Sequence, residues 1–209
     1  MRRAWVCALA VASVWPRPAG AASVDPDTVP VDPATWTSTT TARTDDGKTL
    51  VTKSRYWRKG KKLRVESFEG DFGGRKLATV YCDGSVRSCW TFDAVRGGFV
   101  RGPFDPSVRD EGSWHKQGIE KVGARSCSVW VAERGRTGRK KAGEIREWRA
   151  GRFVMRRMVT MERSSVRVLG MVLPVPGRAE SMEVSEIVKG SVADSDVSLP
   201  ADAKLLETP

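Results

Sequence analysis

The sequence predicts a mainly β protein, built as an antiparallel sheet, a sandwich or a barrel. Many short segments alternate apolar and polar residues, and turn residues separate these segments at regular intervals. The clearest segment is 153–161, whose apolar face is interrupted only by Arg157 and comprises Phe153, Met155, Val159 and Met161. No internal repeat and no heptad pattern accompanies these segments, so we expect an all-β fold.

Taken in chain order, the expected strands are separated by turns of two kinds. Asp45-Asp46-Gly47, Asp83-Gly84 and Ala150-Gly151 have the composition of hairpin turns, while 58–62 and 134–141 are basic turns. The expected strands are 36–44, 49–57, 63–68, 77–82, 86–92, 119–122, 126–133, 144–148, 153–161, 166–173 and 180–189. The pattern lapses between 101 and 118, where any helix is short, and 171–177 is expected to form an apolar loop.

The first residues have the pattern of a secretory signal peptide. Arg2 and Arg3 precede a short apolar run, and small residues favour cleavage after Ala21 or Ala22. The same arginine pair would also begin a twin-arginine signal. We therefore expect a signal peptide at 1–22, an extended linker at 23–34 and a single domain at 35–209. The exported protein is expected in the periplasm, with an extracellular location as the alternative.

The exported chain is basic and carries three cysteines. Removal of three arginines with the signal peptide lowers the formal charge from +11 to 11 − 3 = +8. An oxidising compartment favours a disulfide, and the intervening turn favours a bridge between Cys82 and Cys89. Because a two-residue turn would set Cys82 opposite Ser85, this bridge requires a wider loop. A bridge from either residue to Cys127 remains the alternative.

The sequence offers little for catalysis, metal binding or nucleic-acid recognition. His115 is the only histidine, and the cysteines form no CxxC pair, so neither a catalytic triad nor a structural zinc site is supported. We therefore expect no enzyme activity, no metal and no cofactor. Nucleic acid is not expected as a partner because no recognition motif accompanies the positive charge of an exported chain.

Two groups of residues leave alternatives open. Tryptophans occur near almost every strand pair and either pack the core or line an apolar ligand cavity; they are Trp36, Trp57, Trp90, Trp114, Trp130 and Trp148. The basic clusters at 55–62 and 134–141 either keep the protein soluble or face an anionic membrane surface or an acidic protein partner.

Several segments, in order, resemble the LolA-like family of outer-membrane lipoprotein-sorting proteins. The segments that carry this resemblance cover most of the exported chain and are 56–66, 81–84 with 89–93, 120–127, 143–157 and 195–201. The resemblance implies an antiparallel sheet curled into an unclosed half-barrel, with short helices or loops over its mouth and an apolar hollow for acyl chains. It also implies that Arg64 faces inward and helps to hold the lid.

These observations together predict an exported binding or carrier protein for a lipid or a lipidated protein. Its ligand is expected on a concave face that includes Trp57, Arg64, Val65, Trp90, Phe92, Trp130, Met155 and Met161. The alternative is a periplasmic protein-interaction or sensor domain on the same fold, which would use the basic hairpin rims.

Overall fold

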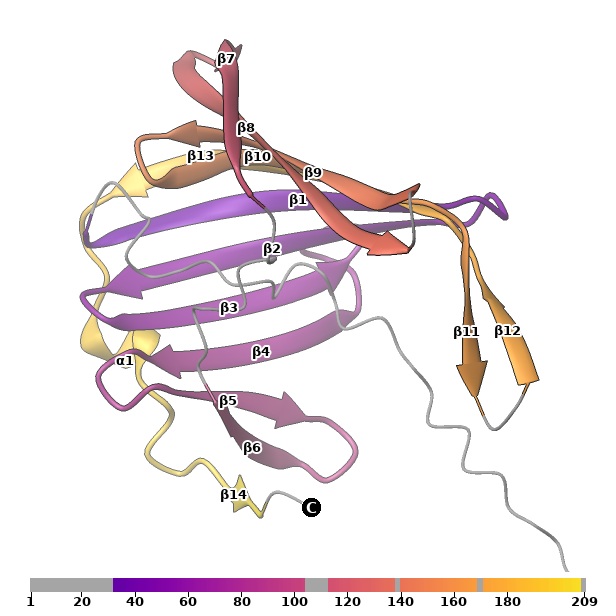
Figure 1. Ribbon diagram of the computed structural model, residues 1–209. Helices are drawn as coiled ribbons and strands as arrows, with labels where there is room; N and C mark the ends of the chain where they lie inside the picture. The colour runs from indigo at the N-terminus through magenta and orange to yellow at the C-terminus, as the bar shows by residue number, and fades with distance from the viewer. Residues whose placement is uncertain (1–31, 104–112, 138–139, 169–170, 208–209) are drawn as a thin grey trace, which may run out of the picture.

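The computed structural model describes residues 32–103, 113–137, 140–168 and 171–207. The predicted signal peptide and most of the predicted linker lie outside these ranges. Within them, the chain is almost entirely β-structure (Figure 1). The strands of the large sheet are β1 Ala34–Thr44, β2 Thr49–Lys59, β3 Lys62–Glu69, β4 Lys76–Asp83, β5 Ser88–Asp93, β6 Gly98–Pro103, β7 His115–Val122, β8 Arg125–Thr137, β9 Lys140–Ala150, β10 Phe153–Met161, β13 Arg178–Lys189 and β14 Leu205–Leu206.

These twelve strands form one open sheet in the order β14-β6-β5-β4-β3-β2-β1-β13-β10-β9-β8-β7. All pairs of neighbours are antiparallel except β14 and β6, which run parallel. The two edge strands, β14 and β7, do not pair with each other, so the sheet is not closed into a barrel. A twisted sheet this wide is expected to curl. The predicted unclosed antiparallel sheet is confirmed.

The predicted hairpin turns lie where the sequence places them. Gly60 joins β2 to β3 with a φ of 57°, and Gly151 joins β9 to β10 with a φ of 64°. Both angles are in the left-handed region, which glycine enters without the penalty that a Cβ atom would cause. Glycine at these two positions therefore fixes where each hairpin turns.

Residues 166–173 do not continue the large sheet, contrary to the prediction. β11 Ser164–Val168 and β12 Met171–Val175 instead pair with each other as a separate two-stranded sheet. The predicted apolar loop at 171–177 is therefore partly a strand. The reason is topological: β10 already lies between β9 and β13, so the segment that follows it meets no free sheet edge.

Two further strands were not predicted in full. β6 occupies 98–103, where glycine and proline hide the alternation, and it is defined by its pairing with β5. His115 lies in the segment 101–118, where no strand was expected, but it begins β7 directly opposite Val131. In both places a partner strand supplies the hydrogen bonds that local composition does not predict.

The described residues contain one helix, α1, which spans Asp194–Val197 and contacts β2 and β3. The resemblance implied short helices or loops over the mouth of the half-barrel. In the part of the chain that the structure describes, the only helix is this single turn. No helix in that part is long and apolar enough to span a membrane.

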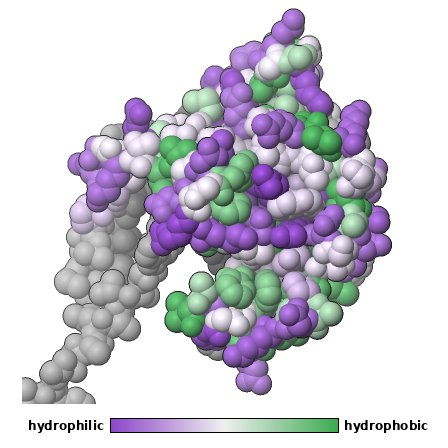
Figure 2. All heavy atoms as spheres, turned by 180° about the vertical axis from the view of Figure 1, so that it is seen from behind, coloured by the Kyte–Doolittle hydropathy of each residue, from purple (hydrophilic) through white to green (hydrophobic). Residues whose placement is uncertain are grey.

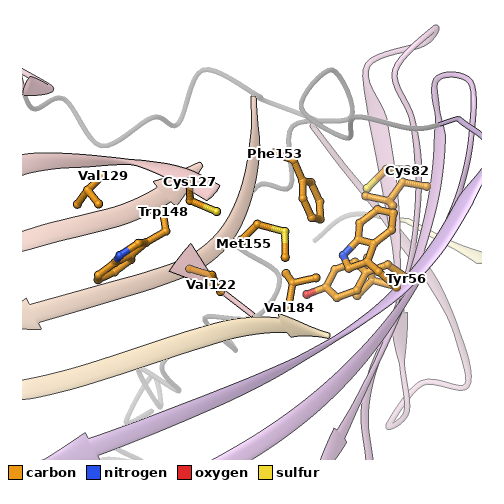
Figure 3. Packing of buried hydrophobic residues seen from close by; sticks show 12 residues of the cluster. Tyr56, Cys82, Val122, Cys127, Val129, Trp148, Phe153, Met155 and Val184 are labelled. Carbon is orange, nitrogen blue, oxygen red and sulfur yellow. The ribbon is translucent and has the colours of Figure 1, made fainter. Parts of the chain in front are cut away.

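The core is one continuous cluster of buried side chains. Trp36 stacks on Tyr56 with ring centroids 4.9 Å apart, and Phe153 meets Trp36 edge-on at 5.7 Å. Figure 3 shows the labelled side chains running from Val129 and Trp148 through Met155 and Val184 to Tyr56. Strands from both halves of the sheet therefore share one core.

Candidate functional site

The two faces of the sheet are defined most clearly over β1 to β5. Trp36, Tyr56 and Val65 lie directly opposite one another on β1, β2 and β3, so they share one face, which we call the core face. Their chain neighbours Trp57 and Arg64 are also paired, and they lie on the opposite face because side chains alternate along a strand.

The structure divides the predicted ligand-binding residues between these faces. Val65 and Met155 belong to the buried core cluster. Four others lie on the opposite face, namely Trp57, Arg64, Trp90 and Phe92. These residues do not share one concave face, so that prediction is wrong. It grouped residues by type and ignored the alternation of side chains along each strand. Arg64, which the resemblance implied to face inward, lies on the face opposite to Val65.

The remaining two predicted residues lie in the other half of the sheet. Trp130 is opposite Glu147 on β9, and the Arg149 guanidinium lies 5.3 Å from the centroid of its ring. Met161 ends β10, and 39% of its surface is exposed. The structure therefore does not bring these two residues together with Val65 and Met155 as one site.

The core face carries a group of buried hydroxyl side chains that was not predicted from the sequence. This hydroxyl cluster, none of whose members is more than 6% exposed, comprises Ser38, Thr40, Thr52, Ser54 and Ser67. Register places Ser38, Ser54 and Ser67 in one row across β1, β2 and β3, and Thr40 opposite Thr52 in the next row. The signal was serine and threonine at every second position of two paired strands.

Most of this cluster is satisfied internally. The Ser54 and Ser67 hydroxyls are 2.8 Å apart, and the Ser38 hydroxyl donates to the Tyr56 phenol oxygen at 3.2 Å. Burial raises the pKa of Tyr56, and hydrogen bonds from Ser38 and Ser54 offset only part of that increase. The phenol therefore stays neutral and extends the polar row towards Trp36.

The opposite face carries a row of aromatic and arginine side chains. Pairing between successive strands from β2 to β6 places them side by side in the order Trp57, Arg64, Tyr81, Trp90 and Arg101. The Arg64 guanidinium lies 4.7 Å from the centroid of the Trp57 ring and 5.5 Å from that of Tyr81. Cation–π contacts of this kind hold an arginine flat between its neighbours.

Charged groups on this face are bound to one another and to the C-terminal segment. Glu66 Oε1 accepts from Arg64 at 2.7 Å and from Lys76 at 2.9 Å. Burial alone would raise the pKa of Glu66, but these two partners outweigh burial and lower it. Arg64 also donates to the Asp196 carbonyl of α1 at 3.5 Å. The Arg64 side chain is therefore committed to internal contacts.

The basic turn between β2 and β3 is partly occupied in the same way. Lys59 pairs with Asp194 at 3.4 Å, and Lys62 donates to the Ser198 hydroxyl at 3.0 Å, whereas Lys61 is exposed. The other predicted basic turn, 134–141, includes residues 138–139, which lie outside the described residues.

Exposed apolar side chains gather at the far end of the same half of the sheet. Figure 2 shows a mainly hydrophilic surface with hydrophobic residues concentrated at its lower end, where Figure 1 places β5, β6 and β14. The exposed side chains in this region are Phe92, Val95 and Leu205.

The predicted disulfide is formed between Cys82 and Cys89. The two residues are directly opposite each other on β4 and β5, with Cα atoms 4.1 Å apart. The turn between the strands spans 84–87, which is the wider loop that the bridge requires. Cys127 is free and buried, and burial raises the pKa of its thiol.

No cluster of three or more potential metal-binding side chains occurs among the residues that the structure describes. His115, the only histidine of the chain, is exposed on β7.

No family model and no curated protein matches this chain. Among solved structures, an uncharacterized conserved protein from Thermus thermophilus is similar at 14% identity and a TM-score of 0.46, over 83% of this chain and 90% of that one. A LolA superfamily protein from Nitrosomonas europaea is similar at 11% identity and a TM-score of 0.41, over 82% and 92%. A domain assigned to outer-membrane lipoprotein sorting, from Vibrio parahaemolyticus, is similar at 9% identity and a TM-score of 0.36, over 79% and 89%. Proteins of the kind that the sequence segments resemble thus occur among the structural neighbours, at low identity.

Proposed function

We propose that this protein is an exported carrier that shelters a lipid, or the acyl chain of a lipoprotein, against the core face of its open sheet. On this proposal residues 1–22 are removed during export, and the domain that begins near residue 35 acts in the periplasm. Val65 and Met155 are the two predicted ligand-binding residues that lie on the face the ligand would contact.

The observation that supports this proposal is an open sheet whose apolar core cluster draws on strands of both halves. The apolar face of a single sheet is stable only when a second layer covers it. Among the described residues, α1 is a single turn that reaches Arg64 on the opposite face, while β11 and β12 pair with each other and project from one end of the sheet. An acyl chain that enters this cluster would add apolar contacts to it, and the burial of the chain would provide the binding free energy.

A lipid-uptake experiment with matched methionine variants tests the proposal. Met182 is half-buried and packs against the core cluster, whereas Met158 is 47% exposed. We expect uptake of a fluorescent fatty acid by the unmodified protein, a roughly tenfold weaker uptake by Met182→Trp because about 1.4 kcal/mol of contact is lost, and no change in Met158→Trp. Native mass spectrometry of the purified protein should detect copurified lipid. Absence of both copurified lipid and uptake would overturn the proposal.

A protein-interaction or sensor role is the second candidate, and the exposure of Lys61 at the β2–β3 turn favours it. An acidic partner would bind there through long-range attraction. Lys61→Glu should then abolish capture of that partner and leave fatty-acid uptake intact. The opposite result, weaker uptake with unchanged capture, would count against the interaction role.

A further inference from the structure

One member of the hydroxyl cluster is buried and has no hydrogen-bond partner within the described part of the chain. Thr40 is 5% exposed, yet its Oγ1 atom neither donates to nor accepts from any group of the residues that the structure describes. Buried polar groups in folded proteins are almost always paired, and each exception requires an explanation. The other described hydroxyls of the cluster do not supply a partner for this atom, although Thr52 lies directly opposite Thr40.

The surroundings of Thr40 combine this unsatisfied hydroxyl with apolar neighbours. Met182 lies directly opposite Thr40 on β13, and it packs against the same core cluster as Met155 and Val184. The side chains of the cluster are small, whereas the Trp36 and Tyr56 rings occupy the neighbouring part of the core face. A hydrogen-bonding group attached to an alkyl chain matches both features.

We infer that the hydroxyl cluster is a polar subsite for the ester carbonyl of a bound acyl lipid, with the Thr40 hydroxyl as the donor. This inference rests on the proposed carrier function and names the chemistry of its ligand. An ester carbonyl is neutral and accepts one hydrogen bond, so it satisfies the hydroxyl without bringing a charge into a buried site. A free carboxylate would have to lose its hydration there and gain no counter-charge from the cluster.

Paired lipids that differ only in this carbonyl test the inference. The probes are a dipalmitoyl phosphatidylcholine and its dihexadecyl ether analogue, each used to displace a bound fluorescent fatty acid. We expect the unmodified protein to bind the ester lipid about five- to tenfold more tightly, the ratio that one hydrogen bond supplies. The preference should disappear in Thr40→Val, which keeps the side-chain shape and removes the hydroxyl.

Two further variants separate the hydroxyl from the fold. Thr40→Ser retains a donor and should keep the preference for the ester. Thr39→Val changes the neighbouring threonine, which is half-buried on the opposite face, and should also keep it. Thermal unfolding of Thr40→Val should show an unchanged or raised Tm, because an unsatisfied buried hydroxyl has been removed.

The outcomes distinguish failure of the subsite from failure of the carrier function. Equal binding of ester and ether lipids by the unmodified protein would overturn the subsite and leave the carrier function standing. An ester preference that persists in Thr40→Val would overturn the role of Thr40. Displacement by neither lipid, together with no uptake of the fatty acid, would overturn the proposed function and the subsite with it.

Discussion

The two faces of the β1–β5 half of the sheet are built from alternate residues of the same strands, yet they are stabilised in different ways. On the core face, Trp36 and Tyr56 stack and are each 1% exposed. On the opposite face, Trp57 is only half-buried and contacts the guanidinium groups of Arg55 and Arg64. One face therefore depends on the exclusion of water, and the other on contacts between aromatic rings and charges.

This difference shows that residue type alone does not assign a side chain to a site. Trp36 and Trp57 are both tryptophans on paired strands, and each is a candidate for an apolar cavity when only composition is considered. Strand parity places Trp57 with Arg64 and places Tyr56 with Trp36. A ligand that binds by its apolar surface should therefore depend on the core face and not on the arginine row.

The largest expected effect is the contrast between the two tryptophans. Trp36→Ala should lower the free energy of unfolding by about 3–5 kcal/mol, because it leaves a large cavity in the core. Trp57→Ala should cost about 1–2 kcal/mol, since it removes cation–π contacts and partial burial. Urea unfolding monitored by far-UV circular dichroism measures both values. Equal losses in the two variants would contradict the proposed difference between the faces.

Reduction of the disulfide should have an intermediate effect. The Cys82–Cys89 bridge links β4 and β5 and closes a short loop, so the chain-entropy model gives a loss of about 2.5 kcal/mol. Urea unfolding with and without a reductant measures this loss. Cys127→Ala is the control, and a reductant should still lower its free energy of unfolding. If a reductant leaves the free energy of unfolding of the unmodified protein unchanged, the bridge does not stabilise this part of the sheet.

The smallest of the three effects is expected on the opposite face, at Glu66. Glu66→Gln removes the charge that Arg64 and Lys76 share, which should cost about 1–2 kcal/mol. Glu69→Gln on the same strand is the matched control, because its partner Arg75 is largely exposed and the pair should contribute little.

The Glu66 carboxylate should also make the stability of the protein depend on pH. Its pKa in the folded protein is below the ordinary value of 4.5, so its stabilising contribution is present above pH 4.5 and is lost as the pH falls through the lowered pKa. Thermal unfolding between pH 7 and pH 3 should therefore show a smaller acid-induced decrease in Tm for Glu66→Gln than for the unmodified protein. An identical decrease in both would contradict the assignment.

Much of the fold could be predicted because its causes are local. Asp83-Gly84 and Ala150-Gly151 indicated turns, the alternation in 153–161 indicated β10, and the spacing of Cys82 and Cys89 required the loop that the structure contains. The predictions failed for β6 and for the β11–β12 hairpin. The pairing of these segments depends on which edge of the sheet is free to accept them. That information is not local.

The sequence by itself determined that the chain forms short antiparallel strands and where most of them turn, because backbone preferences and side-chain alternation act over a few residues. It favoured the bridge between Cys82 and Cys89, and the structure decided between that bridge and one to Cys127. Only the tertiary structure decided which face each strand presents to the core. The register between strands set Val65 apart from Arg64 and gathered the buried hydroxyls around Thr40. Register is set by packing across the whole sheet, and a slip of one residue would exchange the two faces.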